Sequence, residues 1–119
     1  MNKQLIYLAS PYMGTWYQRE LRFLQCARVA GFLISQGNYV FSPITHTHPI
    51  ARVCDLPGGW DYWGGYDRRM IKSCDELMVL TIDGWAESTG VTAELKIAQE
   101  LGKPISYIDY VLLQITPNP

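Results

Sequence analysis

The sequence predicts a single α/β domain in which helices cover both faces of a parallel sheet. Short apolar runs alternate along the chain with longer segments whose apolar residues recur at helical spacing. The runs are apolar at consecutive positions, as in strands buried on both faces. The 119 residues, 48% of them hydrophobic, suffice for one core over residues 1–119. Right-handed crossovers then predict a three-layer, doubly wound sandwich of four or five strands in the order of about 2-1-3-4, with any fifth strand at the edge.

The first part of the chain predicts two short strands joined by one long helix. Residues 5–9 are continuously apolar and end at Ser10-Pro11, which is typical of a buried strand followed by a turn. Residues 15–36 carry apolar side chains at helical spacing, and Gly37-Asn38 supplies a stop signal. Residues 39–41 then form the second strand.

The second part predicts two further strand and helix pairs after an irregular stretch. Residues 44–59 lack periodicity, so we expect a loop with at most one helical turn there. We expect the tail over about residues 112–119 to fray. The other predicted elements, in chain order, are a helix at 60–74, a strand at 77–82, a helix at 91–101, a strand at 105–108 and an edge strand at 111–115.

The charge balance restricts the class of partner. The formal net charge is −1 and no run of Lys or Arg occurs, so the chain lacks the basic face that a nucleic-acid polymer needs. No apolar run is long enough to cross a bilayer, and no signal peptide is evident. The cysteines, Cys26, Cys54 and Cys74, are odd in number and lack metal-ligand spacing. We therefore expect a cytoplasmic protein that binds neither a nucleic-acid polymer nor a membrane.

A doubly wound sheet places its ligand site beyond the carboxyl ends of the strands, which here brings together loops at 10–14, 42–60 and 83–90. Glu94 follows the last of these loops. We expect it in the first turn of a helix, where the helix dipole keeps it ionised. An ionised carboxylate in a cleft can be a nucleophile toward an electron-poor sugar carbon. The alternative is an ordinary helix-capping glutamate.

Asp67 is the second candidate carboxylate. It lies on the predicted helix before the third strand, offset from Tyr66 and Met70. If it leans toward the cleft near another carboxylate, its pKa rises and it can donate a proton to a leaving group. The alternative is a solvated acid that pairs with Arg68 or Lys72.

Other side chains near the predicted site offer ligand contacts. His46 and His48 alternate in the sequence, but a metal site needs a third ligand, so we expect hydrogen bonds or ligand contacts and no metal. Aromatic residues cluster from Trp60 to Tyr66, where they stack on a planar ligand or fill the core. The turn Ser10-Pro11-Tyr12-Met13-Gly14 can bind phosphate or sugar through its backbone but lacks the G-x-G-x-x-G pattern. We expect no cofactor.

These motifs, in this order, resemble the nucleoside 2-deoxyribosyltransferase-like superfamily. The shared features are Ile6-Tyr7-Leu8-Ala9-Ser10-Pro11, then Tyr66-Asp67 through Cys74-Asp75 before a strand, and Ser88-x-Gly90-x-x-x-Glu94 followed by Gly102-Lys103-Pro104. Within that group the chain is especially similar to a small bacterial and phage family, the DUF1937 domain. The resemblance implies a flavodoxin-like (Rossmann-like) fold and cleavage of the N-glycosidic bond of a nucleoside or nucleotide.

The resemblance also assigns roles. Glu94 matches the nucleophile that attacks C1′, Asp67 the acid that assists departure of the base, and Tyr7 a tyrosine that sits against the nucleophile or sugar. The superfamily's nucleoside transferases have aspartate at the position of Ser88 and its nucleotide-cleaving members have serine, so Ser88 favours a 5′-monophosphate. The candidate substrate contacts are Ser10, Pro11, Tyr12, His46, Trp60, Ser88 and Gly90.

Further hypotheses stay open at this point. Tyr12 stands where phosphate-binding relatives tend to have a basic residue, which favours a nucleotide-binding or sensing module without turnover. A phosphoribohydrolase resembling the lysine-decarboxylase-like family ranks last, because Pro57-Gly58-Gly59 lies far from Glu94 in the sequence. Hydrolase and transferase are not distinguished, since water access to the ester intermediate decides between them. The relatives complete each site across a subunit interface, so we expect a homo-oligomer, either a dimer or a tetramer.

Overall fold

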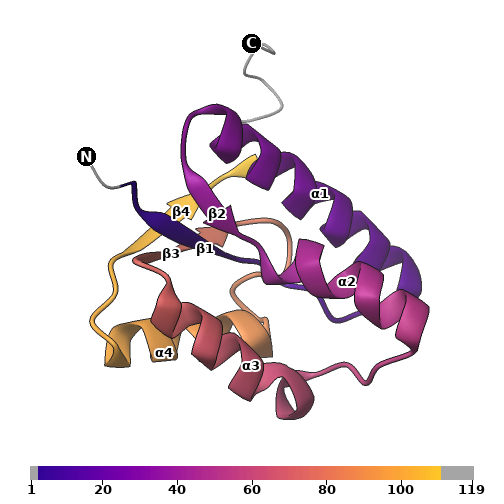
Figure 1. Cartoon of the computed structure of the whole chain (residues 1–119). Coiled ribbons are helices and arrows are strands. Elements are labelled where there is room, and N and C mark those ends of the chain that lie inside the picture. The colour runs from indigo at the N-terminus through magenta and orange to yellow at the C-terminus, as the bar shows by residue number, and fades with distance from the viewer. Residues whose placement is uncertain (1–2, 111–119) are drawn as a thin grey trace.

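The computed structural model describes residues 3–110, in which a parallel sheet ordered β2-β1-β3-β4 separates two layers of helices (Figure 1). The strand order and the parallel pairing confirm the predicted flavodoxin-like α/β fold. The elements are β1 (Leu5–Ala9), α1 (Trp16–Ser35), β2 (Tyr39–Phe41), α2 (Pro43–Cys54), α3 (Trp60–Ser73), β3 (Glu76–Leu80), α4 (Thr89–Glu100) and β4 (Ile105–Ile108).

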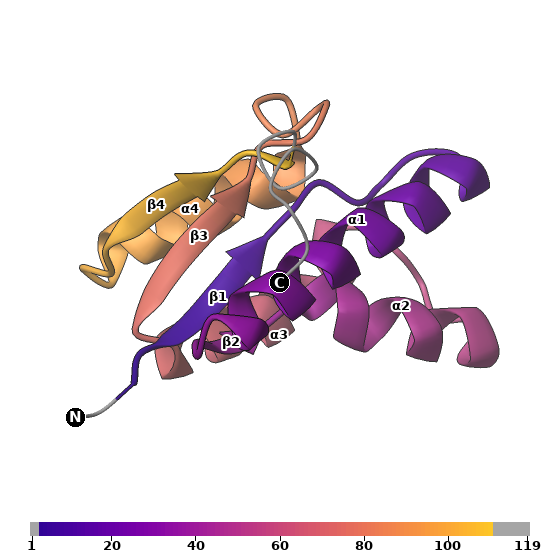
Figure 2. The same cartoon turned by 90° about the horizontal axis from the view of Figure 1, so that it is seen from above.

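The central strand β1 sends alternate side chains into two separate cores. Leu8 packs under α1 with Val29 and other apolar residues, on one face of the sheet. Tyr7 lies on the other face, in a core that includes Ile71 of α3 and Val91 of α4. Figure 2 shows α1 and α4 on opposite sides of the strands. The alternation therefore directs the only polar side chain of β1 toward the α3 and α4 layer.

The segment from Pro43 to Cys54 is a helix, so the prediction of a loop over residues 44–59 was wrong for most of its length. Ser42 caps the helix by accepting a hydrogen bond from the Thr45 N–H at 3.3 Å, and Pro43 occupies the first turn, which needs no donor. Pro49 removes one hydrogen bond from its interior. The inward side of α2 mixes apolar residues such as Ile44 with polar ones that include the buried His48, so its apolar stripe is interrupted in the sequence.

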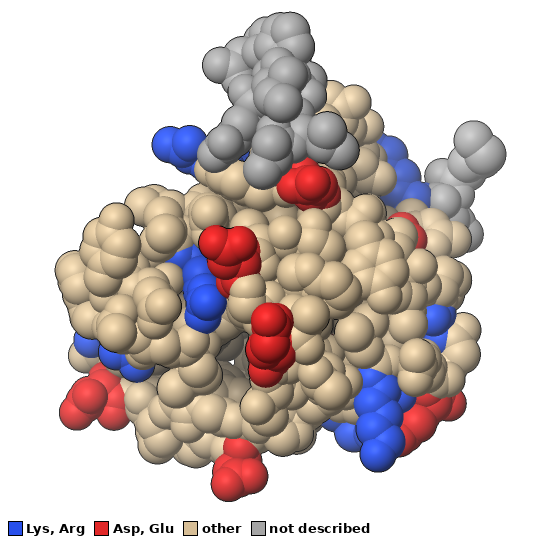
Figure 3. All heavy atoms as spheres, turned by 180° about the vertical axis from the view of Figure 1, so that it is seen from behind, with Lys and Arg blue, Asp and Glu red and all other residues tan. Residues whose placement is uncertain are grey.

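The remaining expectations concern the surface charge, membrane crossing and the C-terminal tail. Figure 3 shows a face on which Lys and Arg are interspersed with Asp and Glu, without a continuous basic area. Within residues 3–110 no helix combines the length and the apolar character that a bilayer crossing requires. The predicted edge strand at 111–115 and the tail at 112–119 lie outside the described residues.

Candidate active site

A cavity of about 890 Å³ opens beyond the carboxyl ends of β1 and β3, where the strand order predicted a site. Its walls come from the β1–α1, α2–α3 and β3–α4 loops and from all four helices, α1 to α4. A volume of this size is in the range of small-molecule sites. The candidate site residues that line it are Ser10, Pro11, Tyr12, Trp60, Asp67, Ser88, Gly90 and Glu94.

Two candidate residues are not part of the cavity wall. Tyr7 is completely buried and reaches the site through Glu94, to whose Oε2 its hydroxyl donates a hydrogen bond of 2.5 Å. His46 is exposed on α2, with its ring against Phe41 and Tyr66. The histidine that lines the cavity is His48, which the sequence analysis considered beside His46 but did not select.

Glu94 lies deeper and further along its helix than the sequence suggested. Ser88 is the N-cap of α4, with its side chain accepting from the Val91 N–H at 3.1 Å, and this places Glu94 in the second turn. Only 4% of Glu94 is exposed. Burial raises its pKa to about 8, the Tyr7 hydrogen bond lowers it, and the charge of Asp67 raises it. The expectation of an ionised Glu94 held by the helix dipole was wrong, because that effect fades beyond the first turn and desolvation dominates.

Asp67 is the half-buried partner of Glu94 across the site. Burial raises its pKa to about 6, and a hydrogen-bond interaction with Tyr7 partly offsets this rise. The direction agrees with the raised pKa expected from the sequence, but the cause is burial and not the neighbouring carboxylate that the sequence suggested. The one hydrogen of the Tyr7 hydroxyl is donated to Glu94, and near neutral pH the two carboxyl groups together hold about one proton. Such a pair can combine a nucleophile with a proton donor.

The cavity also contains basic side chains that the sequence analysis missed. Arg19 and Arg22 line it from α1, and Arg52 lines it from α2. Arg22 donates to the carbonyl oxygens of Met13 and Asp83, and Arg52 pairs with Glu20. Arg19 has no hydrogen-bond or ion-pair partner among residues 3–110. The signal was present in the spacing, because Arg19 and Arg22 are three residues apart on one helix face beside the first loop.

No metal site is evident in the part of the chain that the structure describes, because no three His, Cys, Asp or Glu side chains are grouped there as ligands would be. His48, which the sequence placed near another histidine, has Tyr12 and Glu20 as its ring-nitrogen partners instead.

Comparisons with known proteins agree with this fold. The model of a family described as a domain of unknown function, DUF1937, matches residues 4–110. The chain belongs to the DUF1937 family. Among solved structures it is similar to a 2-deoxyribosyltransferase from the psychrotolerant bacterium Bacillus psychrosaccharolyticus, with 26% identity and a TM-score of 0.59 over 88% of this chain and 72% of that chain. These matches confirm the resemblance to the nucleoside 2-deoxyribosyltransferase-like superfamily. No curated protein matches the chain.

The raised pKa of Glu94 predicts a pH-dependent cost in stability. The folded protein binds the proton of Glu94 more tightly than the unfolded chain, so the contribution of Glu94 to stability is greatest below pH 4.5 and is lost as the pH rises through about 8. Glu94→Gln removes the titrating group and keeps an acceptor for Tyr7. We expect its melting temperature to rise relative to the wild type by about 5 °C or more between pH 5 and pH 8.5.

Thermal unfolding followed by circular dichroism measures this difference. Glu87→Gln is the matched control, because Glu87 lines the same cavity but is exposed. A melting-temperature difference between Glu94→Gln and wild type that stays constant across this pH range would show that Glu94 is not protonated in the folded protein.

Proposed function

We propose that this protein cleaves the N-glycosidic bond of a nucleoside 5′-monophosphate, passing the sugar either to water or to a second base. The observation that carries the proposal is the buried Tyr7–Glu94 hydrogen bond with Asp67 on the wall of the same cavity. The similar solved structure is a 2-deoxyribosyltransferase, which supports the same bond as the target. The substrate is a small molecule, in keeping with the size of the cavity.

The reacting form is the singly protonated pair with its proton on Asp67 and with Glu94 ionised, which the raised pKa of Glu94 makes the minor form. The Glu94 carboxylate attacks C1′ as the bond from C1′ to the base nitrogen breaks, and the bonding electrons leave with the base. Asp67 gives its proton to the departing base, which leaves neutral. The ester between Glu94 and the sugar is then attacked by water or by an incoming base, with Asp67 now accepting the proton.

Tyr7 positions the nucleophile in this scheme. Its hydroxyl donates to Oε2 of Glu94, so Oε1 is the oxygen left for attack. Burial is the main cause that raises the pKa of Tyr7 well above its ordinary value, and the charge of Glu94 adds to it. The hydroxyl therefore stays a donor throughout the pH range of the reaction and stabilises the ionised form of Glu94 each time it is generated.

A 5′-phosphate would bind at the start of α4. The N–H groups of Thr89 and Gly90 lie in the first turn of α4, so they have no carbonyl partner within the helix. The Ser88 side chain accepts from the N–H of Val91 and leaves these two donors free of it. Both residues line the cavity together with Ser88. A helix N-terminus with a serine hydroxyl suits a phosphate, and the unpaired Arg19 adds a full positive charge.

The functional assembly in this proposal is a homo-oligomer. Tyr17, Leu21 and Leu24 are exposed at 69%, 42% and 54%, and they form an apolar stripe along the outer side of α1. Trp16, which is 66% exposed, adds apolar surface at the cavity wall. A second copy of the chain would cover this surface beside the site.

The protonation of Glu94 favours one alternative function. A neutral glutamic acid is a poor nucleophile, so a protein that only binds or senses a nucleotide would have a reason to keep it buried and protonated. The basic residues of the cavity suit either function. A measurement of turnover therefore distinguishes the enzyme from the binding module.

The direct test is release of free base. We expect the wild type to release base from at least one member of a panel of ribo- and 2′-deoxyribonucleoside monophosphates, as followed by chromatography. Glu94→Ala should lower kcat by about 1,000-fold or more, because the ester cannot form. Glu87→Ala removes an exposed carboxylate from the same cavity and should change kcat little. A bound nucleotide that remains intact for days would instead support the binding module.

The shared proton predicts a bell-shaped dependence of kcat/KM on pH. Activity should rise as the first proton leaves the pair near pH 6 and fall as the second leaves near pH 8. Asp67→Asn should lower kcat and abolish the falling limb, since no shared proton is left to lose. A falling limb that persists in Asp67→Asn would contradict the assignment of the acid.

Arg19 should distinguish nucleotides from nucleosides. We expect Arg19→Ala to raise KM for a monophosphate substrate about tenfold and to change KM for the corresponding nucleoside by less than about twofold. Arg28→Ala is the control, because Arg28 is on the same helix but outside the cavity wall. Equal increases in KM for the nucleotide and the nucleoside would show that the phosphate does not bind near Arg19.

A further inference from the structure

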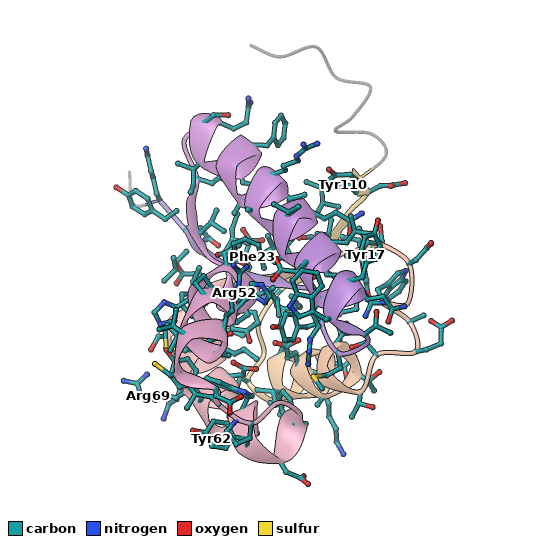
Figure 4. The ribbon with its side chains drawn as sticks, turned by 90° about the vertical axis from the view of Figure 1, so that its right-hand side faces the viewer. Tyr17, Phe23, Arg52, Tyr62, Arg69 and Tyr110 are labelled. Atoms are coloured by element: carbon teal, nitrogen blue, oxygen red, sulfur yellow. The ribbon has the colours of Figure 1, made fainter. Side chains whose placement is uncertain are left out.

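A second polar cluster borders the cavity where α1 meets α2, and the proposed function gives it no role. Its members are Tyr12, Glu20, His48 and Arg52, with Phe23 packed against them. Figure 4 labels Phe23 of α1 and Arg52 of α2. His48 is 5% exposed, and its ring nitrogens face different partners. Nδ1 lies 2.5 Å from the Tyr12 oxygen and Nε2 lies 3.1 Å from Oε1 of Glu20.

Two helix faces create this cluster. Glu20 and Phe23 are three residues apart on α1, and His48 and Arg52 are four apart on α2, so each pair shares a face. The Phe23 ring stacks on the imidazole with a centroid distance of 4.6 Å and an interplanar angle of 27°. Arg52 lies 2.8 Å from Glu20. The orientation of the imidazole is therefore fixed by contacts on its face and at both nitrogens.

These partners determine where the proton of His48 lies. A carboxylate only accepts hydrogen bonds, so in the neutral imidazole the nitrogen that faces Glu20 carries the hydrogen and Nδ1 carries the lone pair. Nη2 of Arg52 is also 3.2 Å from Nε2, but its closer contact is the Glu20 carboxylate. The Tyr12 hydroxyl must then donate its hydrogen to Nδ1.

A tyrosine hydroxyl has a single hydrogen, so the Tyr12 oxygen offers only lone pairs to the cavity that it lines. We infer that Tyr12 determines substrate specificity by accepting a hydrogen bond from an O–H or N–H group of the substrate, and that Glu20 and His48 are positioning residues that hold it in this role. The inference rests on the proposed function.

The donor would be an amino group of the base or a hydroxyl of the sugar. Phosphate oxygens are acceptors at neutral pH, so they would meet the lone pairs of Tyr12 without a hydrogen between them. Burial is the main cause that raises the pKa of Tyr12, which keeps its hydroxyl neutral at neutral pH. An oriented acceptor rejects a substrate that lacks the donor more strongly than an apolar wall does.

Calorimetric titration with matched nucleotides tests the inference. The pairs dGMP and dIMP, and dAMP and purine 2′-deoxyriboside monophosphate, differ only in the amino group of the base. The pairs AMP and dAMP, and dAMP and 2′,3′-dideoxy-AMP, differ in a sugar hydroxyl. We expect the wild type to bind the donor-bearing member of at least one pair about tenfold more tightly or better. Tyr12→Phe should reduce that preference to about twofold by weakening binding of the donor-bearing member.

The positioning role has its own readout. His48→Phe keeps the stacking on Phe23 but removes the acceptor, so it should lose the same preference as Tyr12→Phe. The double variant should be no worse than either single variant, because both act on one contact. His46→Phe is the control, since His46 is exposed on the same helix. Nitrogen-15 NMR of the free wild type should show His48 with its hydrogen on Nε2.

The outcomes separate this inference from the proposed function. A preference that survives Tyr12→Phe, a wild type that discriminates in none of the pairs, or a hydrogen on Nδ1 of neutral His48 would overturn the inference while leaving nucleotide cleavage intact. A wild type that binds none of these nucleotides would overturn both. Loss of the preference in Tyr12→Phe and in His48→Phe, with tight binding of the control, supports the inference.

Discussion

Burial of the Glu94 carboxyl group against the Tyr7 hydroxyl is the constraint on which the rest of the site depends. A carboxylate removed from water without compensation costs several kcal/mol, so this group must keep a proton or a strong donor. The donor comes from the central strand β1, and the pleat turns it toward the layer of α3 and α4. Ser88 fixes where α4 begins and thereby brings Glu94 to that hydroxyl.

The cavity has an electrostatic polarity that follows from the layers of the fold. Its buried and half-buried carboxyl groups, Glu94 and Asp67, come from α4 and α3. Its guanidinium groups come from α1 and α2, where Glu20 pairs with Arg52. Positive charge develops on a sugar ring as its bond to the base breaks, and nearby carboxylates stabilise it. In the proposed function the α4 N-terminus and Arg19 would hold the phosphate, and Asp67 and Glu94 would face the sugar.

The sequence was sufficient for the sheet and for the acidic half of the site, because both depend on local signals. Continuous apolar runs mark the buried strands. Glu94 follows the capping residue Ser88 on one helix, and Asp67 lies on the helix that leads into β3. How deeply Glu94 is buried could not be predicted from local signals. It depends on Tyr7, which is 87 positions away in the chain, and on how completely the surrounding core excludes water. The pKa of Glu94 was therefore mispredicted although its position at the cavity was expected.

Helix α2 was missed for a reason that bears on function. A helix that is held to its neighbours by apolar side chains alone shows a continuous stripe at helical spacing. Helix α2 instead combines an apolar contact of Ile44 with polar contacts of His48 and Arg52 to Glu20 of α1. It also contains Pro49, which weakens it. A polar face of this kind adds less to stability than an apolar one would, because each buried polar group must first be desolvated. The polar side chains of α2 are better explained by what they present to the cavity than by what they contribute to folding.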